Sequence, residues 1–162
     1  MGFNKATAIE LVTMIARNVE NITRLQLLDL CYQTDRLHLS MLGRVITGAA
    51  YSVEGGGKQL GSEDLLPLID SVLSSKIEQV DEIQPDKENI VLGSYGDAHI
   101  EGSDLSASDE DAVNLVVDLF LNSQDPDYTS TYPAVSDSKA VSLEDIVKTI
   151  PGSDDLRQYL FG

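Results

Sequence analysis

Apolar residues recur every three or four positions along much of the chain, which is the period of an α-helix with one buried face. The pattern is strongest after Thr23, a residue whose hydroxyl can accept a hydrogen bond from the free N–H groups of a helix start, and it ends at Gly43, where a left-handed residue would close the helix. Ser62, Ser106 and Ser142 precede three later stripes in the same way. The predicted helices cover about 5–19, 24–42, 63–77, 107–120 and 143–150, with a short turn near 156–160.

The apolar stripes also predict which side chains face the core. In the second helix the expected core-facing residues are Leu25, Leu28, Cys31, Tyr32, Leu39 and Leu42. In the helix that follows Ser106 they are Ala112, Val113, Val116, Leu119 and Phe120. We therefore expect both helices to be buried along one side only.

Two short segments have the composition of β-strands. Residues 45–53 are rich in β-branched and small residues and predict a short strand or hairpin, and residues 89–93 predict a second short strand. Three glycines at 55–57 mark a turn, and 124–138 is expected to be a long loop. We expect a mainly α fold (α+β), a compact single-domain helical bundle over 1–162 with a small β-hairpin or short strands.

The charge of the chain is uneven. Eleven Lys and Arg against 27 Asp and Glu give a formal net charge of −16 over 162 residues. Up to position 62 there are six basic and five acidic residues, whereas the acidic C-terminal portion from about 63 holds five basic and 22 acidic residues. Such a field repels nucleic-acid backbones and anionic membranes, so we expect neither as a direct partner and expect a partner with a basic surface.

Residues for metal or nucleotide chemistry do not occur at the spacings that such sites need. The two histidines and the single cysteine, Cys31, form no zinc-binding pattern. The Gly-Lys pair at 57–58 lacks the Ser or Thr of a phosphate-binding loop, and the acidic turn from Asp97 lacks the bidentate glutamate of a calcium loop. We therefore expect no metal, no cofactor and no enzymatic activity.

Three features of the sequence bear on the cellular compartment. One cysteine excludes an internal disulfide and fits a reducing environment. No stretch approaches the roughly 20 apolar residues of a membrane-spanning helix, and the first residues lack the basic and apolar regions of a secretory signal. The expected location is the cytoplasm.

Asp35 and His38 lie on or beside the apolar stripe of the second predicted helix. One interpretation is a carboxylic acid and a base held in a pocket for proton transfer. The other is an ion pair of Asp35 with an arginine at the helix boundary, with His38 as a structural or surface residue. No Ser or Cys nucleophile with a matching third group can be identified from spacing, which favours the structural interpretation.

The run ITRLQLLDLCYQTDRLHL at 22–39, followed by GRVITG at 43–48 and then Tyr51, resembles the Panacea family of SocA-like antitoxin domains. In that family a leucine-rich helix leads through Tyr, an Ala-Asp-Arg-like step and His-Leu to Gly-Arg-x-Ile-x-Gly and an aromatic residue. LSASD at 105–109 also resembles the start of a later helix of the family. The matching residues are Leu25, Leu28, Tyr32, Asp35, Arg36, His38, Leu39, Gly43, Arg44, Ile46, Gly48 and Tyr51. The chain departs from the family at Asp29, usually a basic residue, and at 55–58, usually a Gly-Pro-Val-like turn.

The resemblance implies a mainly helical domain that binds a toxin protein and neutralises it, or presents it to a protease. An acidic surface is physically suited to cover a basic toxin, so charge points in the same direction. The alternative is an acidic inhibitor from a phage or other mobile element that blocks a nucleic-acid-binding host defence protein by mimicking the phosphate charge. Both hypotheses leave the oligomeric state open. The expected protein-interaction residues are Asp35, Arg36, His38, Arg44, Tyr51, Asp109, Glu110 and Asp111.

Overall fold

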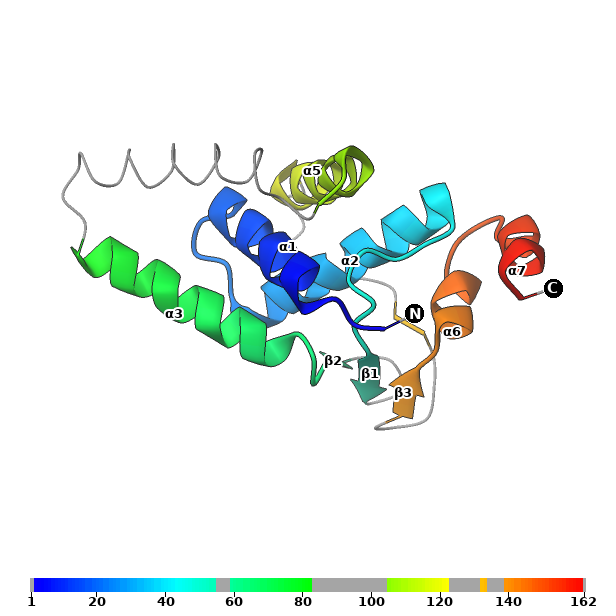
Figure 1. Cartoon of the computed structure of the whole chain (residues 1–162), viewed down its shortest axis with the longest axis horizontal. Helices are drawn as coiled ribbons and strands as arrows, with labels where there is room; N and C mark the ends of the chain where they lie inside the picture. The colour runs from blue at the N-terminus through cyan, green and yellow to red at the C-terminus, as the bar shows by residue number, and fades with distance from the viewer. Residues whose placement is uncertain (1, 55–58, 83–104, 123–131, 134–138, 162) are drawn as a thin grey trace.

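The computed structural model describes residues 2–54, 59–82, 105–122, 132–133 and 139–161. Within these ranges the chain forms six helices and one three-stranded antiparallel sheet, which confirms the expected α+β fold (Figure 1). The strand expected at 89–93 and most of the loop expected at 124–138 lie outside the described residues. The helices are α1 (Lys5–Asn18), α2 (Arg24–Leu42), α3 (Leu66–Glu82), α5 (Ala107–Asn122), α6 (Leu143–Lys148) and α7 (Asp154–Phe161), and the strands are β1 (Tyr51–Glu54), β2 (Gln59–Gly61) and β3 (Lys139–Val141).

Helix starts and ends follow the local signals closely. Thr23 and Gln26 form a capping box at the start of α2, in which each side chain accepts a hydrogen bond from the other residue's backbone N–H. Gly43 ends α2 in the left-handed conformation with φ 74° and donates its N–H to the carbonyl of Leu39. Ser142 caps α6 by the same reciprocal bonding, with Asp145 as its partner. These predicted ends are confirmed.

The start of α3 differs from the prediction. We expected the helix from residue 63, but it begins at Leu66. The side chain of Ser62 accepts a hydrogen bond from the N–H of Leu65 and donates one to the carbonyl of Ala50. Residues 63–65 therefore form a turn anchored to the segment before β1, and Pro67 is tolerated because it falls at the second helical position.

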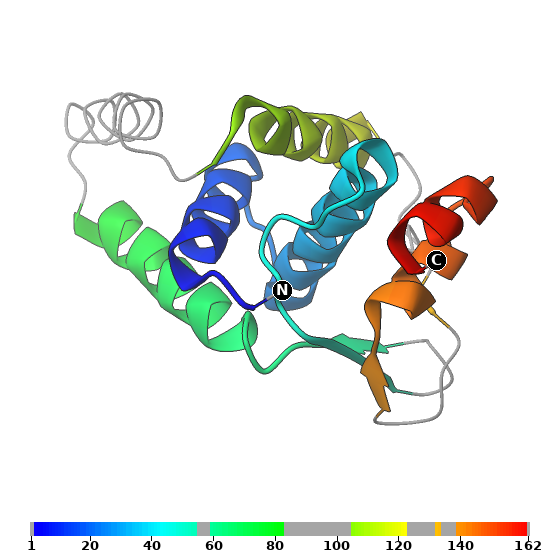
Figure 2. The same cartoon turned by 45° about the vertical axis from the view of Figure 1, so that its right-hand side comes forward.

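Helix α2 lies at the centre of the bundle and packs against α1, α3 and α5 (Figure 1). Neighbouring elements surround most of α2, because side chains on several of its faces are completely buried. Figure 2 shows α5 along one edge of the bundle and the small sheet at the opposite edge. The fully buried hydrophobic residues of α2 are Leu27, Leu28, Leu30, Cys31, Tyr32 and Leu39.

Three leucines expected in the core are exposed instead. Leu25 and Leu42, at the two ends of α2, have 55% and 53% of their surface exposed, and Leu119 on α5 has 66%. The two leucines of α2 belong to its first and last turns. On α5 the buried stripe runs through Val113, Val116 and Val117, and Leu119 lies outside it.

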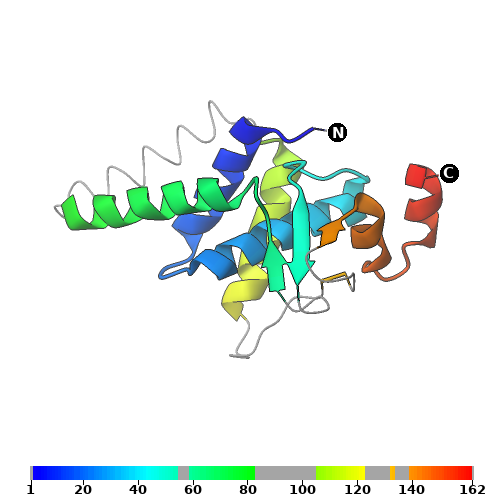
Figure 3. The same ribbon diagram turned by 90° about the horizontal axis from the view of Figure 1, so that it is seen from below.

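The sheet has the order β2-β1-β3, with β1 antiparallel to both neighbours. Val53 is the buried centre of β1, opposite Leu60 on one side and Lys139 on the other. Figure 3 shows this sheet beside α2 and α6. The expected strand at 45–53 is shorter than predicted, because residues 45–50 form an irregular segment that runs over α2.

Candidate functional site

Asp35 holds the segment that follows α2. Its carboxylate is 1% exposed. Oδ1 accepts hydrogen bonds from the backbone N–H groups of Ile46 at 2.8 Å and Thr47 at 3.0 Å, and Oδ2 accepts from the hydroxyls of Thr47 at 2.7 Å and Tyr51 at 2.6 Å. Burial raises the pKa of Asp35, and these four donors offset part of that rise. The partners of this carboxylate are hydrogen-bond donors and not the arginine that the ion-pair interpretation required.

Tyr51 belongs to a group of three tyrosine rings. The ring of Tyr32 lies between those of Tyr51 and Tyr132 in edge-to-face contacts, with centroids 5.3 and 5.4 Å apart. Tyr132 donates its hydroxyl to Oδ1 of Asp29 at 2.6 Å. Asp29, where the Panacea family usually has a basic residue, thus binds a residue from the far end of the chain.

His38 connects α2 to the start of α5. The ring is completely buried. Its Nδ1 lies 2.8 Å from the carbonyl oxygen of Arg44, an acceptor, so Nδ1 carries a proton. Its Nε2 lies 3.0 Å from Oγ of Ser108 and 3.0 Å from Oδ1 of Asp109. The hydrogen bond of Nε2 is the one to Ser108, because Oδ1 of Asp109 has no hydrogen-bond partner among the described residues in spite of its short distance to the ring.

This arrangement differs from a hydrolytic triad. In a triad the carboxylate orients one ring nitrogen while the other nitrogen accepts the serine proton. Here Nδ1 bonds to the backbone carbonyl of Arg44 and not to a carboxylate, and Asp109 lies instead at Nε2, on the same side of the ring as Ser108. The geometry supports a structural role for His38, in line with the interpretation favoured from the sequence.

Asp109 also caps α5. Its Oδ2 accepts a hydrogen bond from the N–H of Ser106 at 3.0 Å, and its own N–H is donated to Oγ of Ser106 at 3.2 Å. The guanidinium of Arg44, 46% exposed, lies 3.5 Å from Oδ1 of Asp109. The capping box predicted from the sequence is confirmed, and it places Asp109 inside the molecule.

Arg36 ties α2 to the end of α6. Its Nε donates to Oγ1 of Thr149 at 2.8 Å, and its Nη2 donates to the carbonyl oxygen of Thr149 at 2.6 Å. The same region encloses the Tyr32 hydroxyl, and burial raises the pKa of Tyr32 to about 12. Arg36 therefore has a structural role in joining two helices, although its side chain is only half-buried.

The eight expected interaction residues thus separate into three groups. Asp35, His38, Tyr51 and Asp109 are at most 4% exposed and bond within the molecule. Arg36 and Glu110 are half-buried, and both make interactions inside the chain. Only two of the eight lie at the surface, and these are Arg44 and Asp111.

The outer face of α5 carries features that the sequence alone did not single out. Leu115 and Leu119, one turn apart, have 49% and 66% of their surface exposed. Asp111 lies one turn before Leu115, and Asp118 lies three residues after Leu115, each with an exposed side chain. We call these four residues the α5 face. The spacing of four between positions 111, 115 and 119 was the available signal, but the buried stripe beside it has the same period.

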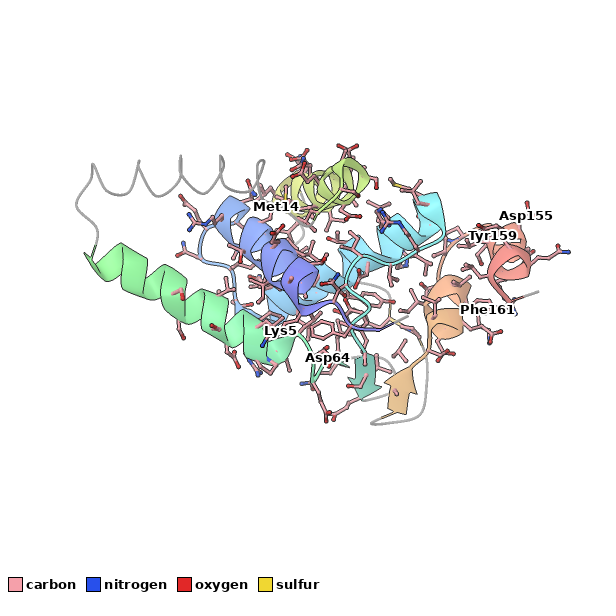
Figure 4. The ribbon with its side chains drawn as sticks, viewed as in Figure 1. Lys5, Met14, Asp64, Asp155, Tyr159 and Phe161 are labelled. Atoms are coloured by element: carbon pink, nitrogen blue, oxygen red, sulfur yellow. The ribbon has the colours of Figure 1, made fainter. Side chains whose placement is uncertain are left out.

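A second group of exposed apolar side chains lies at the C-terminal end of the described chain. Tyr159, 80% exposed, has its ring against the backbone of Gly43, and Phe161 is 47% exposed. Figure 4 shows both on α7 at one end of the molecule. Met41 at the end of α2 is also exposed, at 46%.

Metal ligands do not converge anywhere in the part of the chain that the structure describes, since no group of three or more His, Cys, Asp or Glu could hold an ion there. Among the described helices none combines the length and the apolarity that a membrane crossing needs. Comparisons with protein-family models, curated proteins and solved structures give no match for this chain. The resemblance to the Panacea family stays a prediction.

Proposed function

We propose that this protein is a non-enzymatic, antitoxin-like protein that binds a partner toxin through the α5 face and neutralises it. The observation that carries this proposal is the exposure of Leu115 and Leu119 beside the carboxylates of Asp111 and Asp118. Large apolar side chains grouped at the surface are typical of protein-binding sites. The adjacent carboxylates favour a partner with basic groups.

The buried motif residues support the same function indirectly. Asp35 and His38 resemble the Panacea pattern, and both fix the segment after α2 to the rest of the bundle. His38 also holds the first turn of α5 through Ser108 and Asp109. In this proposal the motif builds the scaffold, and the α5 face contacts the toxin.

The alternative, an acidic inhibitor that imitates nucleic acid, is less well supported. A phosphate mimic needs regularly placed carboxylates, since its target recognises charge. The α5 face instead places two leucines next to two carboxylates, and leucine offers nothing to a phosphate-binding surface. The proposed cytoplasmic location follows from the expected toxin partner and the single, buried Cys31.

The test begins with tagged protein captured from its native cell lysate, with and without nuclease. Stoichiometric partners are identified by mass spectrometry, and each is expressed alone and together with this protein. We expect one partner that stops growth alone and is tolerated when co-expressed. The double variant Leu115→Ser/Leu119→Ser should lose this protection, whereas Leu25→Ser/Leu42→Ser, which removes exposed leucines from α2, should retain it.

Two results would contradict the proposal. A partner that does not affect growth, and that DNA or RNA displaces from the complex, would favour the nucleic-acid mimic. Equal loss of protection in both double variants would mean that the α5 face has no special role. Circular dichroism of each variant establishes that it is folded before the growth assay is interpreted.

A further inference from the structure

The ionisable side chains of α5 are all acidic. Its sixteen residues include four carboxylates and no Lys or Arg. Asp109 is buried beside His38 and the guanidinium of Arg44, whereas Asp111 and Asp118 are exposed on the outer surface of the helix. A second copy of this chain is a poor occupant of the α5 face, because it would bring the same carboxylates together.

The C-terminal end of α5 is negative for two reasons. No basic side chain lies in its last turn, so nothing on the helix offsets the negative end of its dipole. Asp118 lies just before that turn and adds a full negative charge. At the other end the exposed guanidinium of Arg44 lies close to the helix start. A bound cation is therefore favoured beside Asp118 more than beside Ser106.

The shape of the α5 face suits another helix. Asp111, Leu115 and Leu119 lie four residues apart and form a single ridge along α5, which can pack into the groove between side chains of a second helix. A β-strand of the partner would find only a short sheet edge to pair with. The described edge strands, β2 and β3, have three residues each, which is short for adding a further strand.

We infer that the α5 face receives an amphipathic helix of the partner, with apolar residues against Leu115 and Leu119 and Lys or Arg side chains near Asp111 and Asp118. The basic residues concentrate toward the C-terminal end of α5. This inference rests on the proposed function, because it describes how the partner is recognised.

The test uses a synthetic peptide of about 18 residues, five helical turns, with a leucine stripe and flanking lysines. A peptide of the same composition in scrambled order, which has no apolar stripe, is the control. Binding to the full chain is measured by calorimetry at low and at physiological salt. We expect the striped peptide to bind more tightly than the scrambled one, and to weaken as salt is raised.

Variants locate the site. Leu115→Ser/Leu119→Ser should weaken binding of the striped peptide at least about tenfold, whereas Leu25→Ser/Leu42→Ser should change it less than about twofold. Asp118→Asn should weaken binding about threefold and Asp111→Asn less than that. The matched charge controls are Glu20→Gln and Glu63→Gln, both at exposed positions, and these should have no effect.

Absence of binding, equal binding of both peptides, or equal effects of target and control variants would each overturn the inference. Its failure is distinguishable from failure of the proposed function. If the peptide does not bind but α5-face variants still abolish protection from the toxin, the function stands and the partner uses another element. If the peptide binds at the α5 face but no growth-inhibiting partner exists, recognition stands and the toxin proposal fails.

Discussion

The hydroxyl of Tyr51 donates a 2.6 Å hydrogen bond to Oδ2 of Asp35, and both groups are almost completely buried. Asp35 lies in the middle of α2, whereas Tyr51 is the first residue of β1. Through this bond the central helix fixes the position where the sheet begins. The carboxylate meets no basic group among its hydrogen-bond partners, so neutral donors alone stabilise it.

Asp35→Asn should be severely destabilising. An amide at this position turns one acceptor oxygen into an N–H₂ group that faces donors, and buried donors lose their partner. We expect the free energy of unfolding to fall by about 3–5 kcal/mol, and Tyr51→Phe to cost about 1.5–3 kcal/mol. Urea denaturation followed by circular dichroism measures both. Asp70→Asn, at an exposed carboxylate, is the control and should leave the urea midpoint nearly unchanged. Similar losses in Asp35→Asn and the control would refute the role of Asp35.

The His38–Asp109 pair should show strong energetic coupling. His38→Asn removes a buried ring that bonds to the carbonyl of Arg44 and the hydroxyl of Ser108 and lies against Asp109, so we expect a loss of about 1–3 kcal/mol. Asp109→Asn should also destabilise, since the capping box is weakened. The double variant should be less destabilised than the sum of the two, because each single change already removes the contact between the two side chains. Strict additivity in the urea experiment would exclude a direct interaction.

Gly48 is expected to tolerate no side chain. Its φ is +70°, and a Cβ built there would clash with the carbonyl oxygen of Gly2, which lies beside it. Gly152 has nearly the same φ, +69°, with open space around it. Gly48→Ala should therefore cost more stability than Gly152→Ala, by at least about 1 kcal/mol. Equal thermal midpoints of the two variants would mean that the N-terminal segment moves aside.

High pH should unfold the protein. Burial raises the pKa of Tyr32 to about 12 and places the pKa values of Tyr51 and Cys31 well above their ordinary values. The folded state therefore holds protons that the unfolded chain has released, and the free energy of unfolding falls as pH rises above about 9–10. Below that pH range the protonated tyrosines and cysteine cause no loss in the free energy of unfolding.

The measurement is a set of urea midpoints between about pH 8 and pH 11, together with tyrosinate absorbance. Tyr51→Phe should give a shallower fall, because one of the coupled protons is gone. Tyr159→Phe, at a residue that is 80% exposed, is the matched control and should keep the slope of the parent protein. Ionisation of the buried tyrosines before the helical signal is lost would contradict the prediction.

Much of the fold could be predicted because its signals are local. Thr23, Gly43 and Ser142 act on backbone groups within four residues, and the sequence contains both partners of each contact. The segment after α2 could not be predicted in this way. Its residues favour a strand, yet the N–H groups of Ile46 and Thr47 bind the Asp35 carboxylate, eleven or twelve residues earlier.

The candidate site was predicted less well than the fold. Consecutive acidic residues at 109–111 resemble one surface patch in the sequence, but helical geometry turns Asp109 inward and Asp111 outward. Leu119 was assigned to the core because it shares the period of Val116 and its neighbours. The two stripes of α5 differ only by a rotation about the helix axis, which a single sequence does not fix.

The position of β1 has a consequence for how the chain reaches its structure. Val53 pairs with Leu60 after only a short excursion of the chain, but its pairing with Lys139 waits until nearly the whole sequence is present. During synthesis one side of β1 therefore emerges with unpaired backbone groups, which are the kind of edge that other chains can bind. A shortened form that ends before β3 would keep that edge open permanently. Aggregation, more than loss of helix, is then the expected fate of such a fragment.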